Sequence, residues 1–241
     1  MHWKFLHTKQ AEASAIMEKD KNILETLHLE ESPILHTYSF LGKSATYGHF
    51  LEPADFFDLD SAAKSGLILA KRPTGGGVIF HLWDLAFSVF IPSTHPAFSQ
   101  NTLENYATIN RPILYAIEEF MQKSGLTLTP DDGKSLGVGC SHFCMAKPTK
   151  YDVLFEGKKV AGAAQRKTKS GFLHQGSISL LMPSKEFLEP ILRPGLSVIE
   201  GMFAHTFPLL GEKGSLKELD PARQEIQELL KKYLQREIHE R

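Results

Sequence analysis

The chain has little of several features that mark specialised classes of protein. Only two of its 241 residues are cysteine, too few for a disulfide framework. Its 27 lysines and arginines nearly equal its 28 aspartates and glutamates, so no global field favours nucleic acid or an anionic membrane surface. No apolar run approaches the roughly 20 residues that span a bilayer, and the first residues lack the apolar core of a secretory signal. We therefore predict a cytoplasmic protein with no nucleic-acid or membrane partner.

The most informative segment is Lys71-Arg-Pro-Thr-Gly-Gly-Gly-Val-Ile-Phe-His81, in which three glycines separate two apolar runs. Without a Cβ, Gly75, Gly76 and Gly77 can adopt backbone angles closed to other residues and let a ligand approach the main chain. Exposed N–H groups in such a turn form a nest for anions, which the preceding Lys-Arg pair would reinforce. The alternative is a tight hairpin with no ligand, because glycine turns between strands are common.

The two cysteines lie four residues apart, in Gly139-Cys-Ser-His-Phe-Cys144. Their spacing matches no structural zinc pattern, so we expect no bound metal. A free cysteine is often a small core residue. However, Lys147 and Lys150 follow Cys144, and nearby cations lower the pKa of a thiol. An idle buried thiol and a reactive thiolate both stay open.

Apolar periodicity predicts helices interspersed with strands. We expect helices at residues 10–27, 102–123 and 221–241. We expect strands at residues 34–40, 67–70, 78–80, 85–91, 151–155, 159–161 and 178–182. Strands 67–70 and 78–80 should pair across the glycine loop, and Glu156-Gly157 should turn one strand into the next.

The order of these elements predicts a fold class. Because hairpins outnumber crossover units, we expect α+β architecture, with a mixed, largely antiparallel sheet flanked by helices. No repeat or low-complexity linker divides the chain, so we expect a single domain over residues 1–241. Residues 183–220 are rich in proline, glycine and leucine, and we expect them to form a cap or lid.

Three blocks of sequence resemble the catalytic domain shared by lipoate-protein ligases, octanoyltransferases and biotin-protein ligases. They are Arg72-Pro-Thr-Gly-Gly-Gly-Val-Ile-Phe-His81, Gly157-Lys-Lys-Val-Ala-Gly-Ala-Ala-Gln165 and Leu173-His-Gln-Gly-Ser177. The resemblance is closest to lipoate-protein ligases and implies their fold. Many such ligases carry a large C-terminal accessory domain, which we do not expect here because the sequence ends after one more helix.

The resemblance implies that lipoate or octanoate is attached to a lysine of a lipoyl domain. The acceptor would belong to a 2-oxoacid dehydrogenase complex or to the glycine cleavage H protein. A ligase would use ATP, with Mg²⁺ bridging its phosphates, to make an acyl-adenylate. It would need no tightly bound cofactor.

The family pattern also implies roles for individual residues. The glycines at 75–77 would line the acyl and phosphate channel, and Arg72 would steady the anionic end. Lys159 would stabilise charge at the activated carbonyl, although spacing alone makes it a solvated lysine at a strand end. The remaining positions that the pattern places against substrate are Gly162, Ala163, His81 and His174, of which each histidine could equally be structural.

Cys144 departs from the ligase pattern. It lies fifteen residues before Lys159, in a setting that resembles the cysteine block of octanoyltransferases and amidotransferases of this fold. Those enzymes carry the acyl group as a cysteine thioester and use no ATP. Glycine at 77, where cysteine-type transferases usually have arginine, favours the ligase. We therefore expect a lipoate-protein ligase. The alternatives are an octanoyl or lipoyl transferase with Cys144 as nucleophile, and a non-catalytic protein that binds lipoyl domains or acyl ligands.

Overall fold

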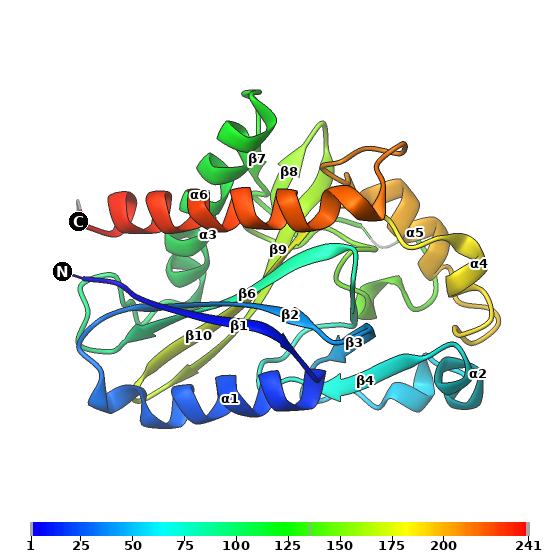
Figure 1. The fold of residues 1–241 in the computed structure, drawn as a ribbon, viewed down its shortest axis with the longest axis horizontal. Helices are drawn as coiled ribbons and strands as arrows, with labels where there is room; N and C mark the ends of the chain where they lie inside the picture. The colour runs from blue at the N-terminus through cyan, green and yellow to red at the C-terminus, as the bar shows by residue number, and fades with distance from the viewer. Residues whose placement is uncertain (1, 135, 240–241) are drawn as a thin grey trace.

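A seven-stranded sheet runs through the middle of the protein in the order β1-β2-β6-β10-β9-β8-β7 (Figure 1). This computed structural model describes residues 2–134 and 136–239. β1 and β2 pair in parallel, and the other pairs in this sheet are antiparallel. The strands are β1 (Lys4–Ala11), β2 (Ile34–Phe40), β6 (Asp84–Pro92), β7 (Thr127–Leu128), β8 (Val153–Phe155), β9 (Lys158–Thr168) and β10 (Gly171–Ser179).

A second sheet of three strands lies beside the first, in the order β4-β3-β5. β3 (Lys43–Tyr47) pairs in parallel with β4 (Leu67–Lys71) and antiparallel with β5 (Ile79–His81). β5 leads almost directly into β6 of the large sheet, so the glycine loop between β4 and β5 lies where the two sheets meet. The predicted α+β class, with mixed and largely antiparallel sheets flanked by helices, is confirmed.

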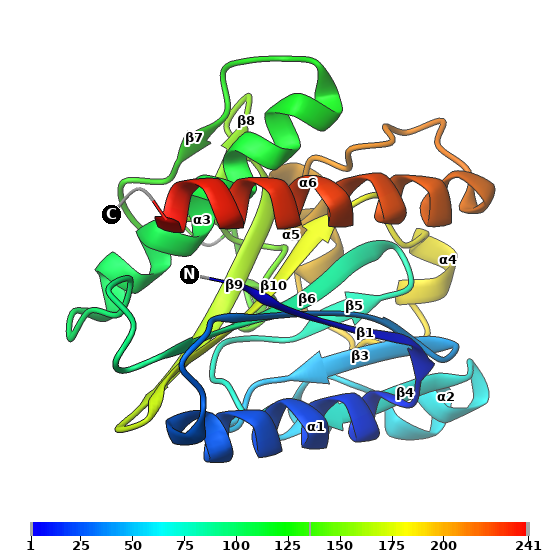
Figure 2. The same ribbon diagram turned by 60° about the vertical axis from the view of Figure 1, so that its left-hand side comes forward.

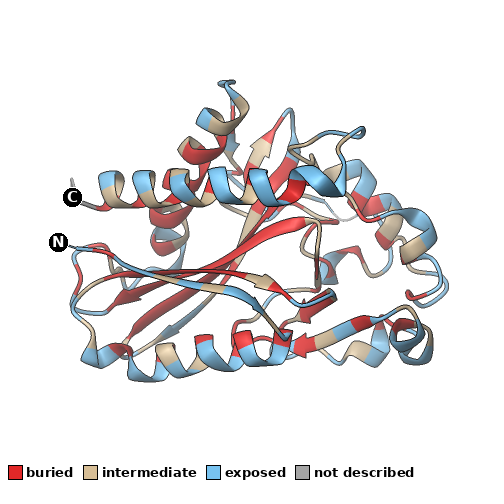
Figure 3. Cartoon of the chain, viewed as in Figure 1, coloured by how far each residue is buried: buried red, intermediate tan, exposed pale blue. Residues whose placement is uncertain are grey.

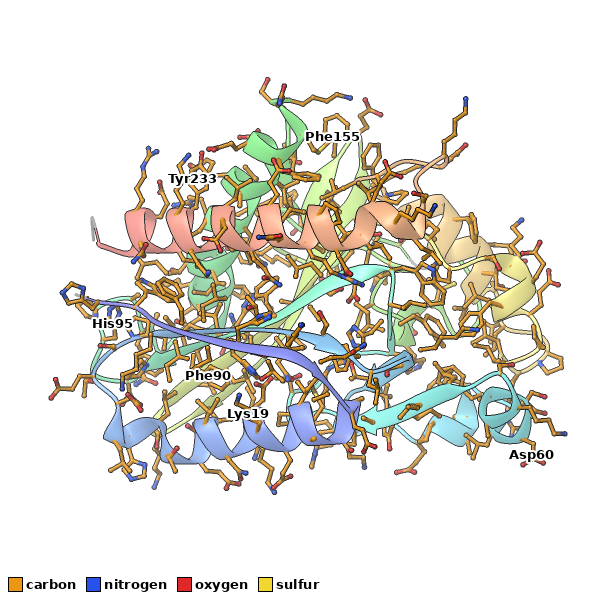
Figure 4. All side chains as sticks on the ribbon, viewed as in Figure 1. Lys19, Asp60, Phe90, His95, Phe155 and Tyr233 are labelled. Carbon is orange, nitrogen blue, oxygen red and sulfur yellow. The ribbon has the colours of Figure 1, made fainter. Side chains whose placement is uncertain are left out.

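Helices cover both faces of the large sheet (Figure 2). α1 (Ala13–Thr26) lies on one face, and α3 (Thr102–Met121) and α6 (Leu219–His239) lie on the other. β6 is buried at every position, because its alternate side chains fill two different cores. Phe87 and its odd-numbered neighbours pack with α3 and α6, whereas Phe90 packs toward the end of α1 (Figure 4).

A further core joins the small sheet to the C-terminal third of the chain. Phe57, Phe80 and Phe143 pack there with Leu188 and Met202. The last two belong to residues 183–220, so this segment is anchored against the small sheet; its role as a cap or lid stays a prediction. The short helices around this core are η2 (Pro53–Asp55), α2 (Leu59–Lys64), η3 (Cys140–His142), α4 (Lys185–Leu188) and α5 (Val198–His205). Two more single turns, η1 (Leu27–Leu29) and η4 (Leu216–Glu218), follow α1 and precede α6.

The helix predictions agree closely with the structure, but two strand predictions are wrong. β4 and β5 do not pair across the glycine loop, because β3 lies between them. The strand expected at 178–182 instead spans Gly171–Ser179. It ends there because the N–H groups of Leu180 and Leu181 both donate to the carbonyl of Trp83.

β1 was not predicted, because its exposed edge carries a weak apolar alternation. The last two residues of the expected C-terminal helix, 240–241, lie outside the described residues. α6 is buried along the side that packs on the sheet and exposed on the opposite side (Figure 3). Among the described residues, no helix is both long enough and apolar enough to span a membrane.

Candidate active site

A cavity of about 30 Å³ lies at the junction of the two sheets and gathers most of the predicted site residues. Its walls are largely apolar and include Met17 of α1, Phe40 of β2 and Ile79 of β5. A second apolar cavity of about 20 Å³ shares Ile79, Met145 and Ser177 with the first. The predicted residues that line the first cavity are Arg72, His81, Cys144, Lys159, Gly162 and Ala163.

Cys144 is held at the mouth of this cavity by pairing with the segment after the glycine loop. Its N–H donates to the carbonyl of Val78 at 2.8 Å, and the N–H of Val78 donates to the carbonyl of His142 at 2.6 Å. Cys144 is partly exposed, whereas Cys140 is buried. The thiol of Cys140 donates to the carbonyl of Ser197, and burial raises its pKa. The accessible thiol is therefore that of Cys144.

Lys159 is a buried cation beside Cys144. Only 2% of the residue is exposed, so it is not the solvated lysine that spacing alone allows. Its Nζ lies 2.6 Å from Oδ2 of Asp152 and donates to the carbonyl of Cys144 at 2.7 Å. Burial raises the pKa of Asp152, although the charge of Lys159 and hydrogen bonds from Thr149 oppose this shift. A Cβ at position 162 would collide with the Lys159 side chain, so glycine there makes room for the ammonium group.

Arg72 is also buried, and its guanidinium organises the glycine loop. Nη2 donates to the carbonyls of Gly75 at 2.8 Å and Gly77 at 2.6 Å. Nη1 donates to the carbonyl of Thr46, and Nη2 also lies 3.7 Å from Sγ of Cys144. The loop therefore turns carbonyls toward the cation. Gly75, Gly76 and Gly77 do not line the cavity that holds the other residues, and their contact with substrate stays a prediction.

The loop glycines allow close packing within the protein. Gly76 has a φ of +81°, a region that favours glycine. A Cβ at position 77 would collide with the carbonyl of His142, so the cysteine segment can pack against the loop only when residue 77 is glycine. A larger side chain there, including the arginine considered above, requires this segment to move.

We expect Gly77→Ala to lower the free energy of unfolding by about 1–3 kcal/mol, the usual range for overpacking. Urea unfolding followed by circular dichroism measures this change. Gly75→Ala is the matched control, because no atom lies within 4 Å of a Cβ built at that position, and it should change stability far less. Equal effects of the two substitutions would contradict the packing argument.

His81 lies at the cavity as part of a hydrogen-bonded group. Its Nδ1 is 2.8 Å from Oδ2 of Asp84, and its Nε2 is 2.9 Å from Oγ1 of Thr46. Ser177 donates to the same oxygen of Asp84 at 2.7 Å. Burial alone would raise the pKa of Asp84, but the charge of His81 and these hydrogen bonds outweigh burial and lower it. The carboxylate therefore fixes the His81 ring with Nε2 toward Thr46.

The turn that carries this pair is strained. Leu82 has a φ of +125°, which is rare for a branched side chain. Arg223 of α6 stabilises the turn by donating to the carbonyls of Leu82 and Asp84. The C-terminal helix thus supports the position of His81 from outside the cavity.

His174 lies apart from the other predicted residues. On β10, Gln175 and Ser177 line the cavity, and the strand alternation turns His174 to the opposite face. There its ring packs near Phe87 and Tyr106. His174 is fully buried, and burial lowers its pKa to about 3. Its assignment to substrate binding stays a prediction.

The buried His174 should make the protein sensitive to acid. Its pKa is about 3 when folded and about 6.5 when unfolded, so between these values only the unfolded state binds the proton. Stability should therefore fall by about 1.4 kcal/mol per pH unit below about 6.5 from this residue. In urea unfolding at several pH values, His174→Gln should remove that part of the slope. His49→Gln, at an exposed position, should keep the wild-type dependence of stability on pH. If His174→Gln also kept it, His174 would not be the source of the acid sensitivity.

A buried polar network that the sequence did not reveal connects α1 to Arg72. Oδ2 of Asp20 accepts from Nε2 of Gln175 at 2.7 Å, and Oε1 of Gln175 accepts from the Thr74 hydroxyl at 2.7 Å. The Thr74 hydroxyl in turn accepts from Nε of Arg72. One signal was present: Asp20 lies between Ile16 and Leu24 on the apolar stripe of α1. A carboxylate on such a stripe is buried and needs partners.

No metal centre is evident in the described part of the chain. Within residues 2–134 and 136–239, no group of three or more histidine, cysteine, aspartate or glutamate side chains is arranged to hold a metal ion. The groups that line the first cavity include two cations, a thiol and the ring of His81, which pairs with Asp84. Such a set can stabilise an anion and supply a sulfur nucleophile.

Comparison with known proteins agrees with this geometry. A family model described as lipoyl protein ligase A/B catalytic domain matches residues 12–197. Curated relatives include the octanoyltransferase LipM of Staphylococcus aureus, 28% identical over 179 residues that cover 73% of this chain and 65% of the relative. Octanoyltransferase LipM of Anoxybacillus flavithermus is 30% identical over 183 residues, covering 74% and 65%. The chain thus spans slightly less than two thirds of the length of these relatives.

Solved structures show the same fold. A lipoate-protein ligase A bound with ATP superposes with a TM-score of 0.73 at 20% identity, covering 99% of this chain and 86% of that one. A bipartite lipoate protein ligase from Thermoplasma acidophilum gives a TM-score of 0.71 at 20% identity, covering 99% and 85%.

Proposed function

Because the chain belongs to the lipoyl protein ligase A/B catalytic domain family, we propose that it is an octanoyltransferase that uses Cys144 as its nucleophile. It moves an octanoyl or lipoyl group from a carrier thioester to a lysine of a lipoyl domain. The observation that carries this proposal is the accessible thiol of Cys144 in one cavity with Lys159 and Arg72. The relatives named octanoyltransferase LipM support this alternative over the ATP-dependent ligase that the sequence favoured.

The proposed reaction has two transfers. The Cys144 thiolate attacks the thioester carbonyl of the donor, and the carrier leaves as a thiolate that takes a proton from solvent. The ε-amine of the acceptor lysine, in its neutral form, then attacks the Cys144 thioester. The C–S bond breaks, so that Cys144 leaves as its thiolate and the amide forms, and the nitrogen releases its extra proton to solvent. Each attack places negative charge on the carbonyl oxygen, which a nearby fixed cation stabilises.

We propose that Lys159 supplies that cation. Its ammonium group already donates to the backbone carbonyl of Cys144 at 2.7 Å, so an acyl group on Sγ would have its carbonyl nearby. The apolar walls of the two adjoining cavities suit an aliphatic chain. Residues 183–220, which contribute Pro183, Met202 and Thr206 to the second cavity, would cover the end of that chain, consistent with the cap expected from sequence.

A choice of donors tests the proposal. The full chain is incubated with an apo lipoyl domain and either an octanoyl thioester of acyl carrier protein without ATP, or octanoate with ATP and Mg²⁺. We expect the octanoyl mass on the acceptor only with the thioester donor. Modification only in the ATP arm would instead establish the ligase, with ATP and Mg²⁺ as substrate complex. Binding of the lipoyl domain without modification in either arm would establish the non-catalytic alternative.

A further inference from the structure

Arg72 is a buried cation that forms no direct ion pair with a carboxylate of the described residues. Only 4% of the residue is exposed, and in the described ranges, 2–134 and 136–239, no acidic side chain lies within 4 Å of its guanidinium. Its partners are neutral: the carbonyls of Thr46, Gly75 and Gly77 and the hydroxyl of Thr74. An ionised group buried without an opposite charge is costly. The surroundings of Arg72 therefore favour an anion beside it.

The thiol of Cys144 is an acidic group in contact with this guanidinium. Nη2 of Arg72 lies 3.7 Å from Sγ, within hydrogen-bonding range for sulfur. The other cation of the cavity is directed elsewhere, since Nζ of Lys159 contacts the carbonyl oxygen of Cys144 and the carboxylate of Asp152. Lys159 and Asp152 also balance each other's charge, so Arg72 provides the uncompensated positive charge at the sulfur.

The other titratable groups that face the same region do not compete for this role. The hydroxyl of Tyr38 stays neutral near pH 7, because burial raises its pKa. The hydroxyl of Tyr106 stays neutral near pH 7, because burial raises its pKa to about 12. His81 contacts Asp84 on one side and Thr46 on the other. Lys147, two residues beyond the buried Met145, is part of the same segment, but the side chain hydrogen-bonded to the sulfur is that of Arg72.

We propose that Arg72 is the counter-ion of a Cys144 thiolate and so makes this sulfur a nucleophile at neutral pH. The thiol proton leaves to solvent, and the positive charge of the guanidinium, whose Nη2 lies 3.7 Å from Sγ, stabilises the sulfur anion. Lys159 is left free to act on the acyl carbonyl. The inference rests on the proposed function for the use of the thiolate, but the thiolate itself can be measured without any acyl donor.

The first test needs no change to Arg72. Thiolate absorbance near 240 nm is titrated with pH for the full wild-type chain and for Cys144→Ser, and the two curves are subtracted. We expect the difference to titrate at least one pH unit below the ordinary thiol value of about 8.5. A difference that titrates at 8.5 or above would overturn the proposal.

The second test uses the rate of alkylation of Cys144 by iodoacetamide, with the modified peptide identified by mass. At pH 7, Arg72→Gln should react at least about threefold more slowly than wild type, and Arg72→Lys should lie between them, because it keeps the charge but not the planar fork. Lys147→Gln is the matched control for loss of a nearby charge and should react at the wild-type rate.

The outcomes separate the two proposals. A folded Arg72→Gln chain that alkylates at the wild-type rate, or an equal loss in Lys147→Gln, overturns the role of Arg72. If Arg72→Gln does not fold, the wild-type titration decides. An ordinary thiol titration in a protein that still transfers octanoate from its thioester donor rejects the Arg72 assignment alone. A low thiol titration without transfer rejects the proposed function alone.

Discussion

Replacing Cys144 with serine is expected to lower octanoyl transfer by on the order of a thousandfold or more, because the attacking sulfur is lost. A serine hydroxyl stays protonated at neutral pH, and Arg72 cannot activate it as it would a thiol. Transfer is measured as the mass of an apo lipoyl domain after incubation with octanoyl acyl carrier protein. The variant should fold normally, since the hydrogen bond that the Cys144 thiol accepts from Arg72 is long, with Nη2 3.7 Å from Sγ.

The same variant should lose the covalent intermediate. Wild-type protein given the octanoyl donor without acceptor should gain one octanoyl group that hydroxylamine removes, as expected for a thioester. Cys140→Ala is the control, because the Cys140 thiol is buried and donates to the carbonyl of Ser197. This variant should still be acylated at Cys144. An octanoyl group that persists in Cys144→Ser, or that maps to Cys140, would reject the transfer mechanism.

Local patterns in the sequence were enough to predict much of the fold. α1, α3 and α6 each carry an apolar stripe at helical spacing, and each packs on the large sheet with that stripe. The Glu156-Gly157 turn also joins β8 to β9 as expected. What local pattern could not give is the partner of each strand. β3 lies between β4 and β5, pairing in parallel with the first and antiparallel with the second, and nothing in the glycine loop itself reveals that third strand.

The candidate site, like the fold, was predicted from sequence only in part. The family resemblance pointed to Lys159, Gly162, Arg72 and Cys144, which the fold brings to one cavity. It did not reveal Asp152, although this carboxylate lies 2.6 Å from Lys159. Asp152 ends a loop stabilised by Thr149, so its position depends on tertiary structure. Nor could sequence show that Arg72 contacts the loop carbonyls, since that follows from how residues 72–77 fold back on one side chain.

The charge of Lys159 is predicted to matter nearly as much as the sulfur of Cys144. Lys159→Met should lower transfer by about 10²–10³-fold, the range seen when one donor to a developing oxyanion is removed. The exposed neighbour Lys158 on the same strand offers the control: Lys158→Met removes an equal charge outside the cavity and should leave the rate unchanged. Initial rates with the thioester donor measure both.

Loss of Lys159 also leaves Asp152 as a buried and unpaired carboxylate, which can cost about 3–5 kcal/mol of stability. The double variant Asp152→Asn with Lys159→Met separates the two effects, because it removes both charges of the pair. It should recover most of the thermal stability lost in Lys159→Met while transfer stays low. Recovery of transfer together with stability would mean that Lys159 only supports the fold, and the positive charge at the thioester carbonyl would have to come from elsewhere.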